Sequence, residues 1–188
     1  MSGTALETRR AFGVLFIGVA AAVSAGAVLS EIAFLSNAPF YYYAIIWLGS
    51  FGATFGAAWP RFRKAIPAIR DRMKSSVRWS QGAKALNAVC WAGPFASIVA
   101  FPALYQYLIL LGIGLGNLAT YAMMKKYSGL DNHEQLIVAA ISLAALPAAL
   151  AIDTSVFAEQ QDIAVVMSRM LIALAYGAGG AYALAAKS

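Results

Sequence analysis

The positions of the positively charged residues constrain this chain more than any other feature. Of its 14 Lys and Arg residues, all but Arg169 lie before the first long apolar run, in two interior stretches or at the C-terminus. The alternate connections between the apolar runs contain no Lys or Arg. In multi-pass membrane proteins, short connections rich in Lys and Arg stay on the cytoplasmic side. The pattern predicts a polytopic helical membrane protein with both termini on the positive side.

The composition supports lipid as the main solvent. The chain is 61% hydrophobic and 12% charged, whereas soluble domains carry about 25% charged residues. A net charge of +6 in a soluble protein would indicate nucleic acid as a partner. Here topology and contacts with anionic lipid headgroups explain the basic residues, so we expect no nucleic acid partner.

Six apolar segments have about the length of roughly 20 residues that a helix needs to cross a bilayer. Their bounds are 11–35, 40–59, 85–101, 103–124, 135–152 and 163–186. We therefore expect an all-α fold in which residues 1–188 form a single transmembrane domain, a bundle of six transmembrane helices. With six segments every basic connection falls on one side, and five or seven would break this agreement. The membrane would be a prokaryotic plasma membrane or an organellar inner membrane.

Residues 61–84 form the only substantial polar connection between these segments. Within it, Ile66, Ile69, Met73 and Val77 recur at intervals of three and four, which is typical of one face of an amphipathic helix. We expect this helix to lie on the membrane surface, either as a linker that fixes topology or as a docking surface for lipid or a partner. Its candidate contact residues are Arg61, Arg63, Lys64, Arg70, Arg72, Lys74 and Arg78.

Charged residues in or beside the apolar segments are candidates for function because burying a charge in lipid is costly. Glu31, Asp153, Asp162 and Arg169 all fall in the half of the membrane away from the basic connections. One interpretation is an ion pair that neutralises Arg169, with Glu31 or Asp153 as its partner. The other is a charged lining at the outer mouth of a pore or substrate cavity.

Two asparagines and two pairs of glycines inside the apolar segments are also candidates for a role. Asn87 and Asn117 either form hydrogen bonds between helices or line a polar path. The G-x-x-x-G pairs Gly112–Gly116 and Gly52–Gly56 predict close helix packing, because small residues let helix backbones approach each other.

No catalytic motif is evident, so we do not favour an enzyme. His133 is the single histidine and Cys90 the single cysteine, and we expect no cofactor and no metal. Helix capping by Asp131 or Asn132 explains the residues around His133 better than a metal site does. Two functions remain: a small channel or transporter for an unidentified ion or small solute, or a non-catalytic structural or accessory subunit. The subunit would contact other membrane subunits or copies of itself.

Overall fold

The computed structural model describes residues 3–75, 78–129 and 131–185, and every regular element in these ranges is helical. The all-α prediction is confirmed. A 3₁₀ turn, Pro102–Leu104, precedes the fourth long helix, and a π-helical segment, Ile152–Val156, extends the fifth. The long helices are α1 (Gly3–Leu35), α2 (Tyr41–Ser75), α3 (Gln81–Ser97), α4 (Tyr105–Ser128), α5 (His133–Ala151) and α6 (Gln161–Ala185).

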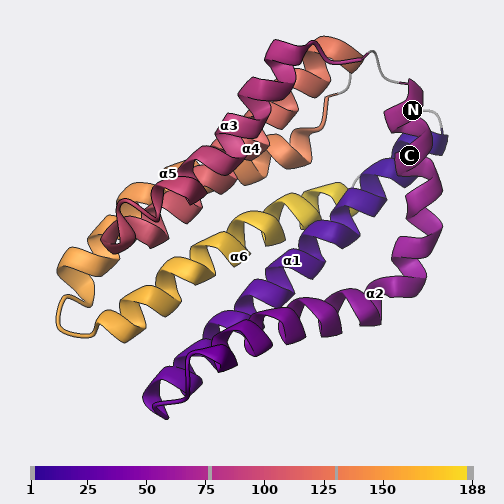
Figure 1. The fold of residues 1–188 in the computed structure, drawn as a ribbon. Coiled ribbons are helices and arrows are strands. Elements are labelled where there is room, and N and C mark those ends of the chain that lie inside the picture. The colour runs from indigo at the N-terminus through magenta and orange to yellow at the C-terminus, as the bar shows by residue number, and fades with distance from the viewer. Residues whose placement is uncertain (1–2, 76–77, 130, 186–188) are drawn as a thin grey trace.

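Successive helices run in opposite directions (Figure 1). The chain termini and the α2–α3 and α4–α5 connections lie at one end of the bundle, which we call the basic end because Arg9 and Lys125 lie there. The other three connections lie at the opposite end, together with Glu31, Asp153 and Asp162. We call this the acidic end.

The helices pack in the spatial order α2, α1, α6, α5, α4, α3, each against the next (Figure 1). The hydrophobic core lies among α1, α4, α5 and α6, where Phe16, Leu110 and Val138 are buried. The rings of Phe16 and Tyr176 meet edge to face with centroids 5.4 Å apart. Because α2 and α3 lie at the two edges of this order, each packs extensively against a single long helix.

Four segments are long and apolar enough to cross a membrane: Leu6–Leu35, Pro102–Ser128, His133–Val156 and Gln161–Ala185. They correspond to the first, fourth, fifth and sixth predicted segments. The second and third predicted segments, in α2 and α3, are not in this set. At about 1.5 Å per residue, the 17 residues of α3 reach less than the roughly 30 Å of a hydrocarbon core. Helix α2 begins with three tyrosines, which lowers its hydropathy.

Residues 61–75 of the basic connection continue α2 without a break after Trp59. Pro60 and Pro67 lie inside α2, and the helix changes direction along its length (Figure 1). Each proline removes a backbone hydrogen bond, which favours bending. The side chains of Arg61, Arg63, Arg70 and Arg78 are exposed. Outside the described residues or side chains lie Lys64, Ile69, Arg72, Met73, Lys74, Val77 and Lys187.

Local signals at the ends of α3 and α4 set the connections at the basic end. Ser80 caps α3, because its hydroxyl accepts a hydrogen bond of 3.2 Å from the Ala83 amide. Gly129 ends α4 with a φ of 62°, a left-handed conformation that glycine adopts without a Cβ clash. Its amide donates to the Lys125 carbonyl, which satisfies one of the last acceptors of the helix.

Candidate functional site

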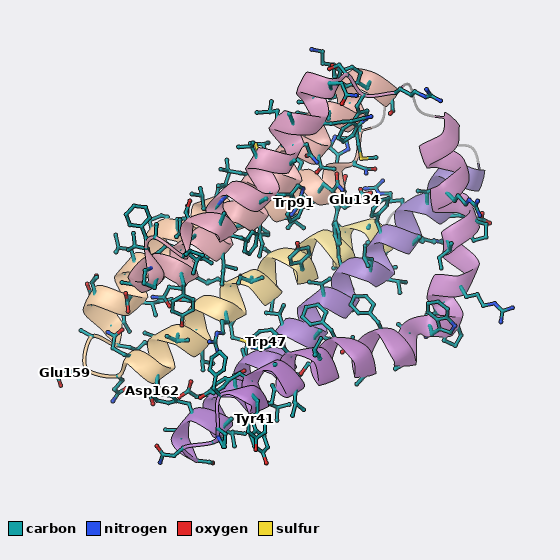
Figure 2. The ribbon with its side chains drawn as sticks, in the orientation of Figure 1. Tyr41, Trp47, Trp91, Glu134, Glu159 and Asp162 are labelled. Atoms are coloured by element: carbon teal, nitrogen blue, oxygen red, sulfur yellow. The ribbon has the colours of Figure 1, made fainter. Side chains whose placement is uncertain are left out.

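The structure brings Glu31 and Arg169 to the same region of the acidic end without pairing them. Glu31 on α1 interacts electrostatically with Arg169 and Asp162 on α6. Among the described residues, no ion pair within 4.0 Å joins Arg169 to Glu31 or Asp153. The Arg169 guanidinium carbon instead lies 5.9 Å from the ring centroid of Trp47 on α2; Figure 2 labels Trp47. One buried carboxylate oxygen, Glu31 Oε1, has no hydrogen-bond partner in the described part of the chain.

Two buried serines accompany this charged pair. Ser30 precedes Glu31 in α1, Ser168 precedes Arg169 in α6, and each is 1% exposed. Neither hydroxyl has a hydrogen-bond partner among the described residues. By contrast, Ser24 donates to the carbonyl four residues earlier in its own helix. The hydroxyls of Ser30 and Ser168 are therefore not satisfied in the way usual for a helical serine.

The packing of α1 on α6 places these two serines at the same level. The helices are antiparallel, with Gly180 against Ile17 and Gly177 against Ala20. Extending this register toward the acidic end brings Ser30 level with Ser168. Nothing in the sequence distinguishes these serines, because single hydroxyls in apolar helices usually bond to their own backbone.

Asp153 belongs to a separate group between α4 and the end of α5. The Tyr107 hydroxyl donates to Asp153 Oδ2, and the Gln161 side-chain amide donates to the Asp153 carbonyl at 3.2 Å. Asp153 Oδ1 and the buried Gln106 Oε1 have no hydrogen-bond partner among the described residues. Asp153 is therefore tied to α4 and to the start of α6, and not to Arg169.

The basic end contains a buried ion pair that the sequence pattern did not predict. Arg9 Nε of α1 lies 3.7 Å from Glu134 Oε2 of α5, and the Glu134 side chain is only 1% exposed. The guanidinium carbon of Arg9 lies 4.5 Å from the ring centroid of Tyr182 on α6, within cation–π range. In Figure 2, Glu134 lies at the end of the bundle opposite to Asp162. The cluster links α1, α5 and α6.

The residues around His133 do not converge on one site. Asp131 lies 3.0 Å from Lys125 Nζ, whereas Glu134 turns inward to Arg9. Hydrogen bonding to Lys125 is the main cause that holds the pKa of Asp131 below its ordinary value. Asn132 is at the N-cap position of α5 without a capping side-chain hydrogen bond, and its amide donates to Met124 Sδ at 3.3 Å. The expected cap is thus absent for Asn132.

The two predicted asparagines both join neighbouring elements. Thr120 Oγ1 of α4 donates to Asn87 Oδ1 of α3 at 3.0 Å and accepts from Trp91 Nε1 at 3.0 Å. Asn117 donates to the Ile113 carbonyl at 2.9 Å and also interacts with Tyr176 of α6. Of the two interpretations made from sequence, these contacts support bonding between helices.

The two glycine pairs have different surroundings. A Cβ at Gly112 would lie 2.8 Å from the ring of Phe95, and one at Gly116 would lie 2.3 Å from Trp91. Helix α3 therefore packs closely on α4 at this pair of glycines. A Cβ at Gly52 or Gly56 would meet no atom within 4 Å in the described chain. Close helix packing on Gly52 and Gly56 therefore stays a prediction, and the helix that packs there would belong to another chain.

Comparisons with family models, with curated proteins and with solved structures found no match to this chain. The fold alone therefore defines its class. In the described residues it is an all-helical protein in which four helices are long and apolar enough to cross a membrane.

Proposed function

We propose that the chain is an integral membrane protein with six spanning helices and both termini on the cytoplasmic side. Successive helices run in opposite directions, so that the basic connections gather at one end of the bundle and the acidic residues at the other (Figure 1). This separation supports the proposed topology. Helix α2 packs along α1, and α3 along α4. If α1 and α4 cross the membrane, the helices packed along them lie at the same depth, although their own hydropathy is lower.

We further propose that the protein is a small channel or transporter that takes up its ion or solute at the acidic end. The observation that carries this proposal is the cluster of Ser30, Glu31, Ser168 and Arg169, which we call the α1–α6 site. Its two charges are close but unpaired, and its two serine hydroxyls are buried without partners. Polar groups in lipid are costly unless something satisfies them. A bound solute would supply the missing partners.

Reconstitution in liposomes tests the transport proposal. The probes are radiolabelled methylammonium, phosphate and glycine, which represent a cation, an anion and a zwitterion. We expect uptake of at least one probe above the protein-free rate, and loss of that uptake in Glu31→Gln. The matched control is Glu159→Gln, because Glu159 is an exposed carboxylate at the same end (Figure 2). Protein-free rates for all three probes would contradict the proposal.

The alternative function, an accessory subunit or a homo-oligomer, is supported by the open face of α2. Gly49, Gly52 and Gly56 follow one another at spacings of three and four, and a Cβ at any of them would meet no atom within 4 Å. In lipid, such faces let a second helix approach closely. Replacing Gly52 by Leu would then disperse an oligomer or complex seen in mild detergent without unfolding the bundle.

The second half of α2 is the proposed contact with anionic lipid headgroups. Its exposed residues Arg61, Arg63 and Arg70 lie beyond the exposed ring of Trp59, a residue that favours the membrane interface. Each basic residue near an anionic surface contributes about 1 kcal/mol. Charge reversal at Arg61, Arg63 and Arg70 should therefore reduce the anionic lipid that copurifies with the protein.

A further inference from the structure

With the neighbouring Asp162 included, the charges at the α1–α6 site do not cancel. Glu31 interacts with Asp162 and Arg169, so the group contains two carboxylates and one guanidinium. The guanidinium lies over the Trp47 ring. A carboxylate in excess within apolar surroundings attracts a cation more strongly than it would in water. An anionic ligand would be repelled by both Glu31 and Asp162.

Among the described residues, the buried atoms of this site that have no hydrogen-bond partner are all oxygens that can accept hydrogen bonds. They are Glu31 Oε1 and the hydroxyl oxygens of Ser30 and Ser168. Ser30 and Glu31 are consecutive on α1, and Ser168 is level with Ser30 on α6. A primary ammonium group has three N–H donors and no acceptor. It therefore matches the site in charge, in the number of hydrogen bonds and in their direction.

We propose that the α1–α6 site binds a small organic cation with a primary ammonium group, held by the Glu31 carboxylate and by the hydroxyls of Ser30 and Ser168. This inference rests on the transport function proposed above and names the substrate class of the same site. Glu31 supplies the charge, and the two hydroxyls distinguish a cation with N–H donors from one without them.

Thermal unfolding of the purified full-length protein in detergent tests this inference with three chloride salts at equal ionic strength. The salts are methylammonium, tetramethylammonium and sodium chloride. We expect a saturable rise in the unfolding midpoint with methylammonium only, because tetramethylammonium has no N–H donor. No rise, an equal rise with all three salts, or a saturable rise with sodium phosphate in place of methylammonium would overturn the inference.

Four variants locate the binding in the same assay. The methylammonium response should disappear in Glu31→Gln, weaken at least tenfold in apparent affinity in Ser30→Ala and Ser168→Ala, and stay unchanged in Glu159→Gln. A wild-type response in Glu31→Gln would overturn the assignment to this site. If Glu31→Gln does not fold, the two serine variants and the choice between methylammonium and tetramethylammonium decide the question.

The binding and uptake assays separate this inference from the proposed function. Saturable methylammonium binding without uptake would support the ligand class and contradict transport. Uptake of phosphate or glycine that depends on Glu31, without a methylammonium response, would support transport and overturn the ligand class.

Discussion

The two ends of the bundle differ in how they treat buried charge. At the basic end, Arg9 and Glu134 form an ion pair and Tyr182 covers the guanidinium. At the acidic end, Glu31 and Arg169 lie on the packed helices α1 and α6 but do not pair. The ion pair and the Tyr182 ring thus link α1, α5 and α6 at the basic end. At the acidic end, Glu31 Oε1 and the hydroxyls of Ser30 and Ser168 have no hydrogen-bond partner among the described residues. Removing one partner of a buried ion pair lowers stability strongly. The loss of stability on such a substitution therefore distinguishes the two ends in an experiment.

The glycine pairs repeat this difference at the two edges of the bundle. Gly112 and Gly116 are covered by aromatic rings of α3, whereas Gly52 and Gly56 are covered by no atom of the described chain. The same sequence pattern therefore serves internal packing on α4 and leaves an open face on α2. Surroundings, and not the motif, decide what such glycines do.

The largest effect is expected from breaking the basic-end pair. Glu134→Gln leaves the partly buried Arg9 without its carboxylate, so the free energy of unfolding should fall by about 3 kcal/mol. Equilibrium unfolding in mixed detergent and SDS micelles measures this change. A loss below about 0.5 kcal/mol, the size usual for a surface substitution, would show that the two ends do not differ as described.

Alanine at the two kinds of glycine should act in opposite directions. In Gly116→Ala the new Cβ meets Trp91 at 2.3 Å, so overpacking should lower stability by about 1–3 kcal/mol. Gly52→Ala meets nothing and should raise stability by up to about 1 kcal/mol, because alanine favours helix more than glycine does. The same unfolding assay compares them. A loss of stability in Gly52→Ala would instead indicate that a second copy or another subunit covers α2.

Neutralising Glu31 should not destabilise the bundle. Its carboxylate is partly desolvated and is repelled by Asp162, and these effects oppose the attraction of Arg169. Glu31→Gln should therefore change the free energy of unfolding by no more than about 0.5 kcal/mol, the size usual for a substitution that breaks no pair, measured without ligand. A loss as large as that of Glu134→Gln would indicate a structural ion pair at the acidic end as well.

The smallest effect is expected from pH at the exposed α4–α5 connection. The hydrogen bond from Lys125 lowers the pKa of Asp131, so its contribution to stability is full above the ordinary carboxyl pKa of about 4. It is lost as the pH falls below that value and through the lowered pKa. The difference in unfolding midpoint between wild type and Asp131→Asn should shrink over this range. A difference that does not change with pH would contradict the interaction with Lys125.

Sequence periodicity and charge predicted much of the fold but little of the site. Apolar length indicated where α1, α4, α5 and α6 lie, and the spacing of Gly112 and Gly116 indicated a packed face. The second predicted segment ended at Trp59, but α2 continues through Pro60 and changes direction (Figure 1). The pairing of Arg9 with Glu134 depends on the rotation of α1 and α5 about their axes. Hydropathy does not contain that information for residues so far apart in the chain.

The most direct test of the difference between the two ends is a pair of double-mutant cycles on unfolding free energy. One cycle combines Arg9→Gln with Glu134→Gln, and the other combines Glu31→Gln with Arg169→Gln. We predict a favourable coupling of about 1 kcal/mol or more at the basic end and a coupling near zero at the acidic end. Equal couplings, or a stronger one between Glu31 and Arg169, would contradict the account.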